Sequence, residues 1–162
     1  PTLMFGWFDR KHLGWLARFM QKLPLFPIPG SGRFIRQPLF VGDFCALIQR
    51  CLENEILCGT YDITGLEKIS YLSLMRQLRC AVRAHPWIIH LPIPLFGFLL
   101  QCWALISRQP AFTRSQLKAL TAGDTFEVID WPSIFSVTPT PLAQALRITY
   151  QDPRFSQVEM PF

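Results

Sequence analysis

Short apolar, extended segments alternate with amphipathic helical patterns over the first ninety residues of this 162-residue chain, and this alternation limits the fold more than any other feature. Extended segments are expected at residues 1–6, 37–41, 59–65 and 87–91. Helices are expected at residues 8–23, 44–52 and 67–84. Strands separated by helices are typical of α/β proteins whose strands run parallel through crossover helices. We therefore predict a single α/β unit, with parallel strands in residues 1–91 and a mainly helical part in residues 92–162.

Prolines, glycines and candidate capping residues mark the ends of these elements. The run PLFPIPGSG, residues 24–32, predicts a loop because proline lacks a backbone N–H and glycine supplies turn conformations. Asp9 is a candidate cap for the first helix, and Ser70 is a weaker one for the third. Asp43 follows Gly42 at the start of the second helix, where we favour a capping role over a catalytic one.

Composition and charge narrow the functional classes. Half of the residues are apolar and 17% are charged, which predicts a packed core rather than disorder. The net charge of +5 is scattered without a dense basic block, so we expect no nucleic-acid binding. The five cysteines form no CxxC and no pattern with histidine that would suit zinc. A reducing compartment, and hence a cytoplasmic location, is the expectation.

One apolar stretch is long enough to be compared with a membrane-spanning helix. Residues 86–107, PWIIHLPIPLFGFLLQCWALIS, carry no full charge and match the roughly 20 residues of a spanning helix. Pro92 and Pro94 interrupt the stretch, so that the uninterrupted helical part runs only from Leu95 to Ile106. A short buried or interfacial helix is the preferred interpretation, and peripheral contact with a membrane or a large partner at Leu95 to Ile106 stays open.

Motifs that would carry catalysis are missing from the sequence. It holds no glycine-rich dinucleotide fingerprint between a strand and a helix and no GxSxG nucleophile elbow. The acidic residues at 124, 127 and 130 fit a solvated edge better than an acid–base pair. None of the three tyrosines has a lysine four residues later.

Four segments, taken in order, nevertheless resemble one family. They are PTLMFG, RQPLFVGDFCALI, GTYDITGLEKISYLSLMRQL and FSVTPTPLAQALR. Together they resemble the C-terminal half of the NAD(P)-dependent epimerase/dehydratase family, the extended and atypical short-chain dehydrogenases. Each motif alone is weak, and their shared order along nearly the whole chain carries the resemblance.

The resemblance implies a fold, and it implies separate roles for the two halves of that fold. It implies the C-terminal part of a Rossmann-like parallel sheet with a small helical substrate-binding region, and NAD or NADP bound mainly by an N-terminal half of the same fold. Pro1, Thr2 and Leu3 would approach the nicotinamide side of that cofactor. Arg36, with its neighbour Gln37, would contact the substrate, because nucleotide-sugar enzymes place an arginine there on the substrate phosphate.

The family's Tyr-x-x-x-Lys pair and glycine fingerprint would lie upstream of residue 1, so the chain alone would be a catalytically inactive fragment. Segment 36–48 also departs from the family pattern at Phe40 and Gly42, which leaves the activity of the parent protein open. The alternative is a catalytically silent NAD(P)-binding subunit that serves assembly or interaction, for which contact with a membrane stays open. A scaffold whose arginines are surface charge is the third interpretation.

Overall fold

A computed structural model describes residues 3–9, 12–53, 59–106, 114–123 and 125–156 of the chain. The strands are β1 (Met4–Phe5), β2 (Leu25–Pro29), β3 (Ile35–Arg36), β4 (Leu39–Phe40), β5 (Ile69–Ser70) and β6 (Trp87–Leu91). The helices are α1 (Leu13–Lys22), α2 (Val41–Glu53), α3 (Tyr71–Ala81), α4 (Ile93–Ile106), α5 (Arg114–Ala122), α6 (Trp131–Phe135), α7 (Leu142–Gln151) and α8 (Pro153–Ser156).

The described strands pair into three two-stranded sheets. Two of them are parallel, as the alternation of strands and helices predicts: β1 pairs with β4, and β2 pairs with β6 over five residues. The third pair, β3 with β5, is antiparallel, so the expectation of uniformly parallel strands is wrong there. A mixed α/β fold with small parallel sheets is the result.

Strand β2 replaces the loop that the prolines predict. Gly30 donates its N–H to the carbonyl of Leu91 at 2.7 Å, so the amides of residues 26, 28 and 30 face β6. The nitrogens of Pro27 and Pro29 then face the other edge, where the pairing with β6 requires no donor. Gly30 itself has a φ of +58°, and the predicted turn therefore begins directly after the strand.

The GTYDITG segment, expected to be a strand, has no regular structure, and β5 begins only at Ile69. Its carbonyls bond to side chains instead of a neighbouring strand. The indole N–H of Trp131 donates to the carbonyl of Thr64 at 3.0 Å. Gly65 packs so tightly that a Cβ there would lie 2.2 Å from the carbonyl oxygen of Pro38.

Of the predicted caps, Ser70 is the N-cap of α3, whereas the N-cap residue of α1 is His12 and Asp9 bonds to the helix start from three residues earlier. The carboxylate of Asp9 accepts the N–H groups of His12 and Gly14, both at 3.0 Å, at the start of α1. Helix α6 was not predicted. Asp130, which was expected on a solvated edge, is the N-cap of this helix and accepts the N–H of Ser133.

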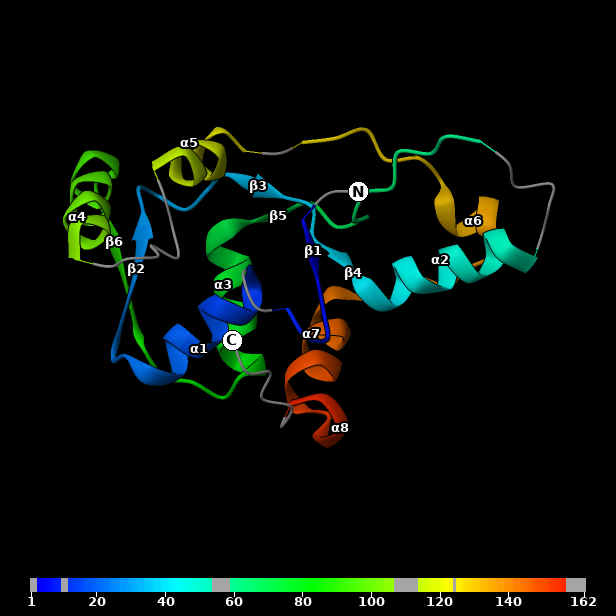
Figure 1. Cartoon of the computed structure of the whole chain (residues 1–162), viewed down its shortest axis with the longest axis horizontal. Helices are drawn as coiled ribbons and strands as arrows, with labels where there is room; N and C mark the ends of the chain where they lie inside the picture. Colours follow the sequence, from blue (N-terminus) through cyan, green and yellow to red (C-terminus); the bar gives the residue numbers. More distant parts are fainter. Residues whose placement is uncertain (1–2, 10–11, 54–58, 107–113, 124, 157–162) are drawn as a thin grey trace.

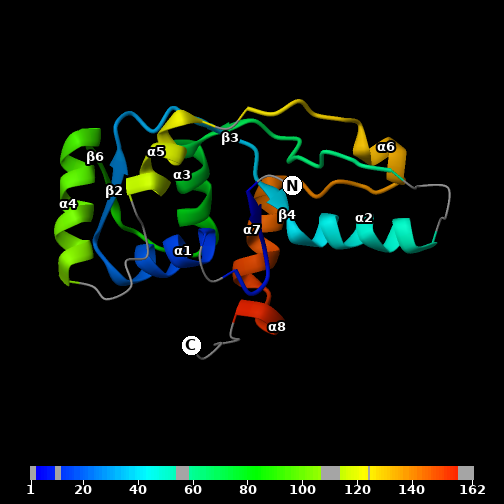
Figure 2. The ribbon, with the colours of Figure 1, turned by 45° about the horizontal axis from the view of Figure 1, so that its top comes forward.

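Two hydrophobic clusters meet at β4. Phe40 belongs to the larger cluster, which joins β1, β2, α1, α3 and α7, whereas Leu39 belongs to a smaller one with Leu47, Trp131 and Phe135. Successive strand residues point to opposite sides, and β4 therefore separates the two clusters. Helices α2 and α6 lie at one end of the long axis and α4 at the other (Figures 1 and 2). Among the described helices, none is both long and apolar enough to cross a bilayer.

Candidate functional site

Residues 36–43, here called the crossing segment, run from β3 through β4 into the first turn of α2. Polar side chains from this segment reach parts of the chain that are distant in sequence. The segment also carries both predicted substrate-binding residues, Arg36 and Gln37.

Arg36 is buried and bonded to α5 instead of being open to solvent. Its side chain is 5% exposed, and its Nη2 donates to the carbonyl oxygen of Leu120 in α5. Removal from water lowers the pKa of the Arg36 guanidinium, and nearby Tyr71 partly opposes that change. Arginine still remains protonated in proteins, so this arrangement holds a positive charge behind α5.

Tyr71 is the first residue of α3 and stands close to this buried charge. Burial raises the pKa of its phenol well above the ordinary value, and the neighbouring Arg36 lowers it by a smaller amount. The phenol is therefore neutral at physiological pH. It is a hydrogen-bonding group and not a base in this state.

Gln37 is 1% exposed and connects three segments. Its Nε2 donates to the carbonyl of Gly65 at 3.3 Å, and its Oε1 accepts the N–H of Phe126 at 2.6 Å. These bonds satisfy both ends of a buried amide. The structure therefore brings Arg36 and Gln37 together but surrounds both with backbone groups of other segments.

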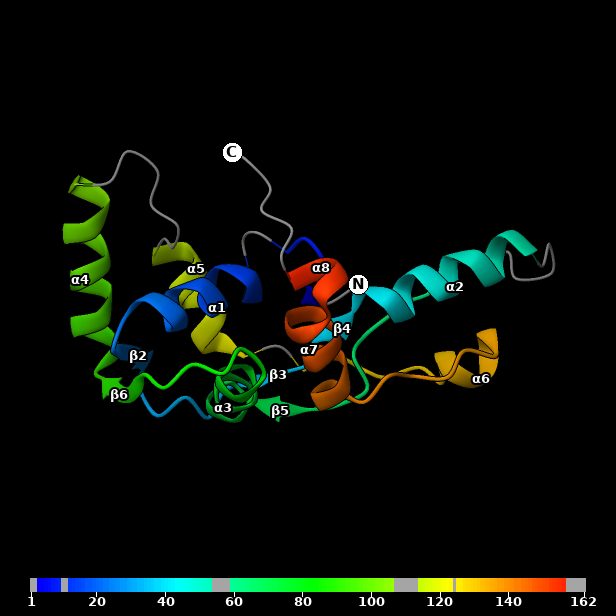
Figure 3. The same cartoon turned by 90° about the horizontal axis from the view of Figure 1, so that it is seen from below.

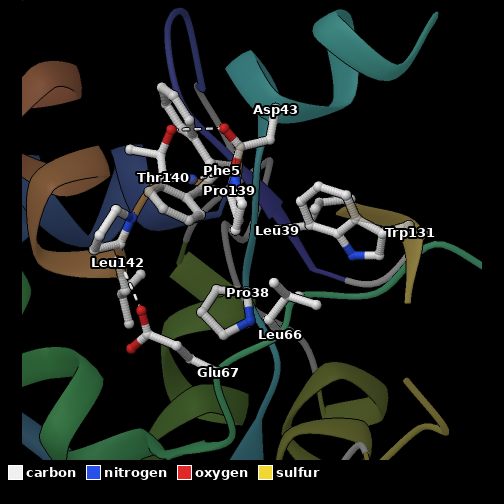
Figure 4. A pocket seen from close by; sticks show the side chains of 13 residues that line it. Phe5, Pro38, Leu39, Asp43, Leu66, Glu67, Trp131, Pro139, Thr140 and Leu142 are labelled. Carbon is white, nitrogen blue, oxygen red and sulfur yellow. Dashed lines mark hydrogen bonds between the residues drawn. The ribbon is translucent and has the colours of Figure 1, made fainter. Parts of the chain in front are cut away.

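Asp43 is in the first turn of α2, because the helix begins at Val41, three residues before the Phe44 start that a cap at Asp43 requires. Its carboxylate accepts the hydroxyl of Thr140 at 2.6 Å and the N–H of Thr140 at 3.0 Å (Figure 4). Thr140 stands between Pro139 and Pro141, so it offers the single backbone N–H of those three residues. Asp43 thus fastens α2 to the entrance of α7.

A pocket of about 200 Å³ lies beside this contact, lined by residues of the crossing segment, residues 65–67, Trp131 and residues 139–142 (Figure 4). Glu67, on the opposite wall, accepts the N–H of Leu142 at 2.8 Å at the start of α7. Both carboxylates are therefore engaged with backbone amides. The volume is below the roughly 300 Å³ at which ligand pockets begin, and we assign this pocket a structural role.

Of the predicted cofactor-binding residues, Pro1 and Thr2 lie outside the described residues. Leu3 is described, and its carbonyl accepts the N–H of Leu39 at 2.8 Å, which extends the pairing of β1 with β4. Its side chain is half-buried against the larger hydrophobic cluster. Among the described residues, no group of three histidine, cysteine or acidic side chains could hold a metal ion.

The sequence alone did not indicate Thr140, Glu67 or Gly65 as partners of this region. Thr140 lies 97 residues from Asp43, and Glu67 lies 75 residues from Leu142. The proline on each side of Thr140 is the one local signal, because it leaves a single donor that needs an acceptor.

No family model matches the sequence, and no curated protein matches it. Solved structures do match. The human epimerase family protein SDR39U1 with NADPH is similar at a TM-score of 0.68 and 17% identity, over 93% of this chain and 46% of that protein. The dTDP-glucose 4,6-dehydratase of Bacillus anthracis with NAD matches at 0.61 and 14% identity, over 95% of this chain and 44% of the other. The UDP-glucuronic acid 4-epimerase of Bacillus cereus with NAD matches at a TM-score of 0.59 and 16% identity, over 92% of this chain and 40% of that protein. The chain thus spans less than half the length of these proteins, and over that part it has the fold of the NAD(P)-dependent epimerases and dehydratases.

Proposed function

We propose that this chain is the C-terminal, substrate-binding portion of an NAD(P)-dependent protein related to the sugar-nucleotide epimerases, dehydratases and reductases. One observation carries the proposal: more than nine-tenths of the chain superposes on structures of such enzymes while covering less than half of each. The order of the sequence segments that resemble the C-terminal half of the family supports the same assignment.

In this proposal NAD or NADP is held mainly by an N-terminal half, which completes the sheet. The glycine fingerprint and the Tyr-x-x-x-Lys pair are absent from these 162 residues, so they would come from that half as well. The cofactor would supply the hydride. Pro1, Thr2 and Leu3 would lie on its nicotinamide side, where Leu3 is anchored by the pairing of β1 with β4.

Arg36 is the proposed anchor for the substrate phosphate. In the described state one of its nitrogens donates to the neutral carbonyl of Leu120. A phosphate is a stronger acceptor, because a charge-assisted bidentate pair exceeds a bond to a neutral carbonyl. Substrate contact would therefore require the end of α5 to move away from Arg36, with Gln37 beside it fixing the backbone of the crossing segment.

Calorimetry with UDP-glucose and NADPH tests this role. Arg36→Ala should weaken UDP-glucose binding by about one to two factors of ten, since hydrogen bonds to charged groups contribute roughly 1.5–3 kcal/mol. NADPH affinity should stay nearly unchanged. Arg33→Ala removes an exposed arginine three residues away and is the matched control. Equal UDP-glucose affinity in Arg36→Ala and Arg33→Ala would remove Arg36 from the substrate site.

A second candidate is a catalytically silent NAD(P)-binding subunit that contacts a membrane or a partner through residues 95–106. It is favoured by the outward side chains of α4, where Leu95, Phe98 and Leu99 are 45%, 58% and 48% exposed. Co-sedimentation with liposomes that is lost in Phe98→Ser, together with NADPH binding without turnover, would support this candidate. Epimerase or dehydratase turnover of a UDP-sugar would exclude it.

A further inference from the structure

A second, larger cavity lies at the end of the molecule that carries α4. Its volume is about 400 Å³, and we call it the α4 cavity. Residues from α1, β2, α4 and the end of α5 line it, together with Tyr71 and Leu91. The helices among these elements lie together at that end when the molecule is seen from below (Figure 3).

The wall of the α4 cavity is almost entirely hydrocarbon. Its aromatic members include Trp15, Phe19, Phe26 and Phe96, and no lining residue carries a full charge. The hydroxyl of Tyr71 and the indole N–H of Trp15 are the polar side-chain groups of this lining. Water is poorly held in such a space, since a buried water needs two to four polar partners.

The chemistry of the wall excludes two kinds of occupant. A nucleotide sugar would bury phosphates and hydroxyls against side chains that cannot bond them, which costs free energy. An added peptide strand would meet the open edge of β2, where Pro27 and Pro29 present no N–H. An apolar chain without a backbone to satisfy fits both constraints.

The rim shows how such a chain would enter. Leu99 and Leu23 line the cavity and are 48% and 43% exposed, so apolar atoms continue from its interior to the surface. Leu120 also lines the cavity, and its carbonyl accepts from Arg36. The volume is within the roughly 300–1,000 Å³ of small-molecule sites.

We propose that the α4 cavity binds the hydrocarbon chain of a lipid-like amphiphile, entering past Leu99. The inference goes beyond the proposed function, because it requires neither a dinucleotide nor a nucleotide sugar. It also differs from surface contact of α4 with a bilayer, since the chain enters between α1 and α4.

The test is a fluorescence titration of the purified protein with N-phenyl-1-naphthylamine, a neutral probe that brightens in apolar surroundings, and competition by 1-dodecanol. We expect saturable binding of one probe per chain and displacement by the alcohol. Leu99→Trp should weaken probe binding about tenfold, because overpacking a site is strongly unfavourable. Leu95→Trp is the matched control: it alters a leucine of the same helix with 45% exposure that does not line the cavity.

A second measurement locates the probe without relying on Leu99→Trp. Energy transfer from tryptophan to the bound probe should fall in Trp15→Phe, which changes the cavity wall, and far less in Trp131→Phe, which lies in the smaller core cluster. The proposal is overturned by unsaturable binding, by equal weakening in Leu99→Trp and Leu95→Trp, or by transfer insensitive to Trp15. A dimer in sedimentation that excludes the probe would overturn it too and assign the cavity to a second copy of the chain.

Discussion

Replacing Asp43 with alanine removes a carboxylate that holds the start of α2 to the entrance of α7. The side chain is 7% exposed, and it accepts a hydroxyl at 2.6 Å and an N–H at 3.0 Å, both from Thr140. Hydrogen bonds to charged groups contribute roughly 1.5–3 kcal/mol each, and partial rehydration of Thr140 offsets some of the loss. We expect Asp43→Ala to lower the free energy of unfolding by about 3 kcal/mol.

Urea unfolding followed by circular dichroism measures this loss. Glu53→Ala is the matched control, because Glu53 is an exposed carboxylate on the same helix whose pairing with Arg50 should contribute at most about 1 kcal/mol. In a double-mutant cycle, Thr140→Val removes the hydroxyl and keeps the N–H, so part of the Asp43 effect should disappear in the Thr140→Val background. A loss in Asp43→Ala no larger than that in Glu53→Ala would refute the proposed structural role.

Three further changes probe the same region. Trp131→Phe should lower the free energy of unfolding by about 1–3 kcal/mol, because it leaves the Thr64 carbonyl without its indole donor in the smaller cluster. A loss below about 0.5 kcal/mol in urea unfolding would contradict this. Gly65→Ala should abolish or severely reduce soluble, folded protein, since its Cβ would meet the Pro38 carbonyl at 2.2 Å; a wild-type melting curve would be the contrary result. Burial raises the pKa of Tyr71, so above about pH 10 the unfolded chain loses its phenol proton first and stability should fall. Tyr71→Phe should make that alkaline fall shallower, and an identical pH profile would show that Tyr71 is not buried as described.

Periodicity was sufficient to predict α1, α2 and α3, because each of these helices buries one face. The short apolar run of β6 and the parallel pairing of β1 with β4 were also predicted. Periodicity failed for β2, where the direction of each amide decides whether proline is tolerated. Pro27 and Pro29 point away from β6, which only the partner strand reveals. It also failed for residues 59–65, whose carbonyls bond to the side chains of Trp131 and Gln37.

The candidate site was partly predictable. The sequence predicted one strand over residues 37–41 with Arg36 just before it, whereas Arg36 is the last residue of β3 and α2 already begins at Val41. The burial of Arg36 depends on Leu120, 84 residues later. Asp43 was expected to cap α2 and instead bonds to Thr140, 97 residues later, for which the flanking prolines are the one local signal. Contacts between distant segments therefore determined what these polar side chains do.

The most direct test of the central proposal is a crystal structure of the protein that contains these residues, with NADPH bound. The proposal predicts that the nicotinamide lies beside residues 1–3 and that the adenosine and pyrophosphate are held by residues outside this 162-residue chain. A dinucleotide held entirely by residues of this chain, or no binding of either NAD or NADPH to the protein, would contradict it.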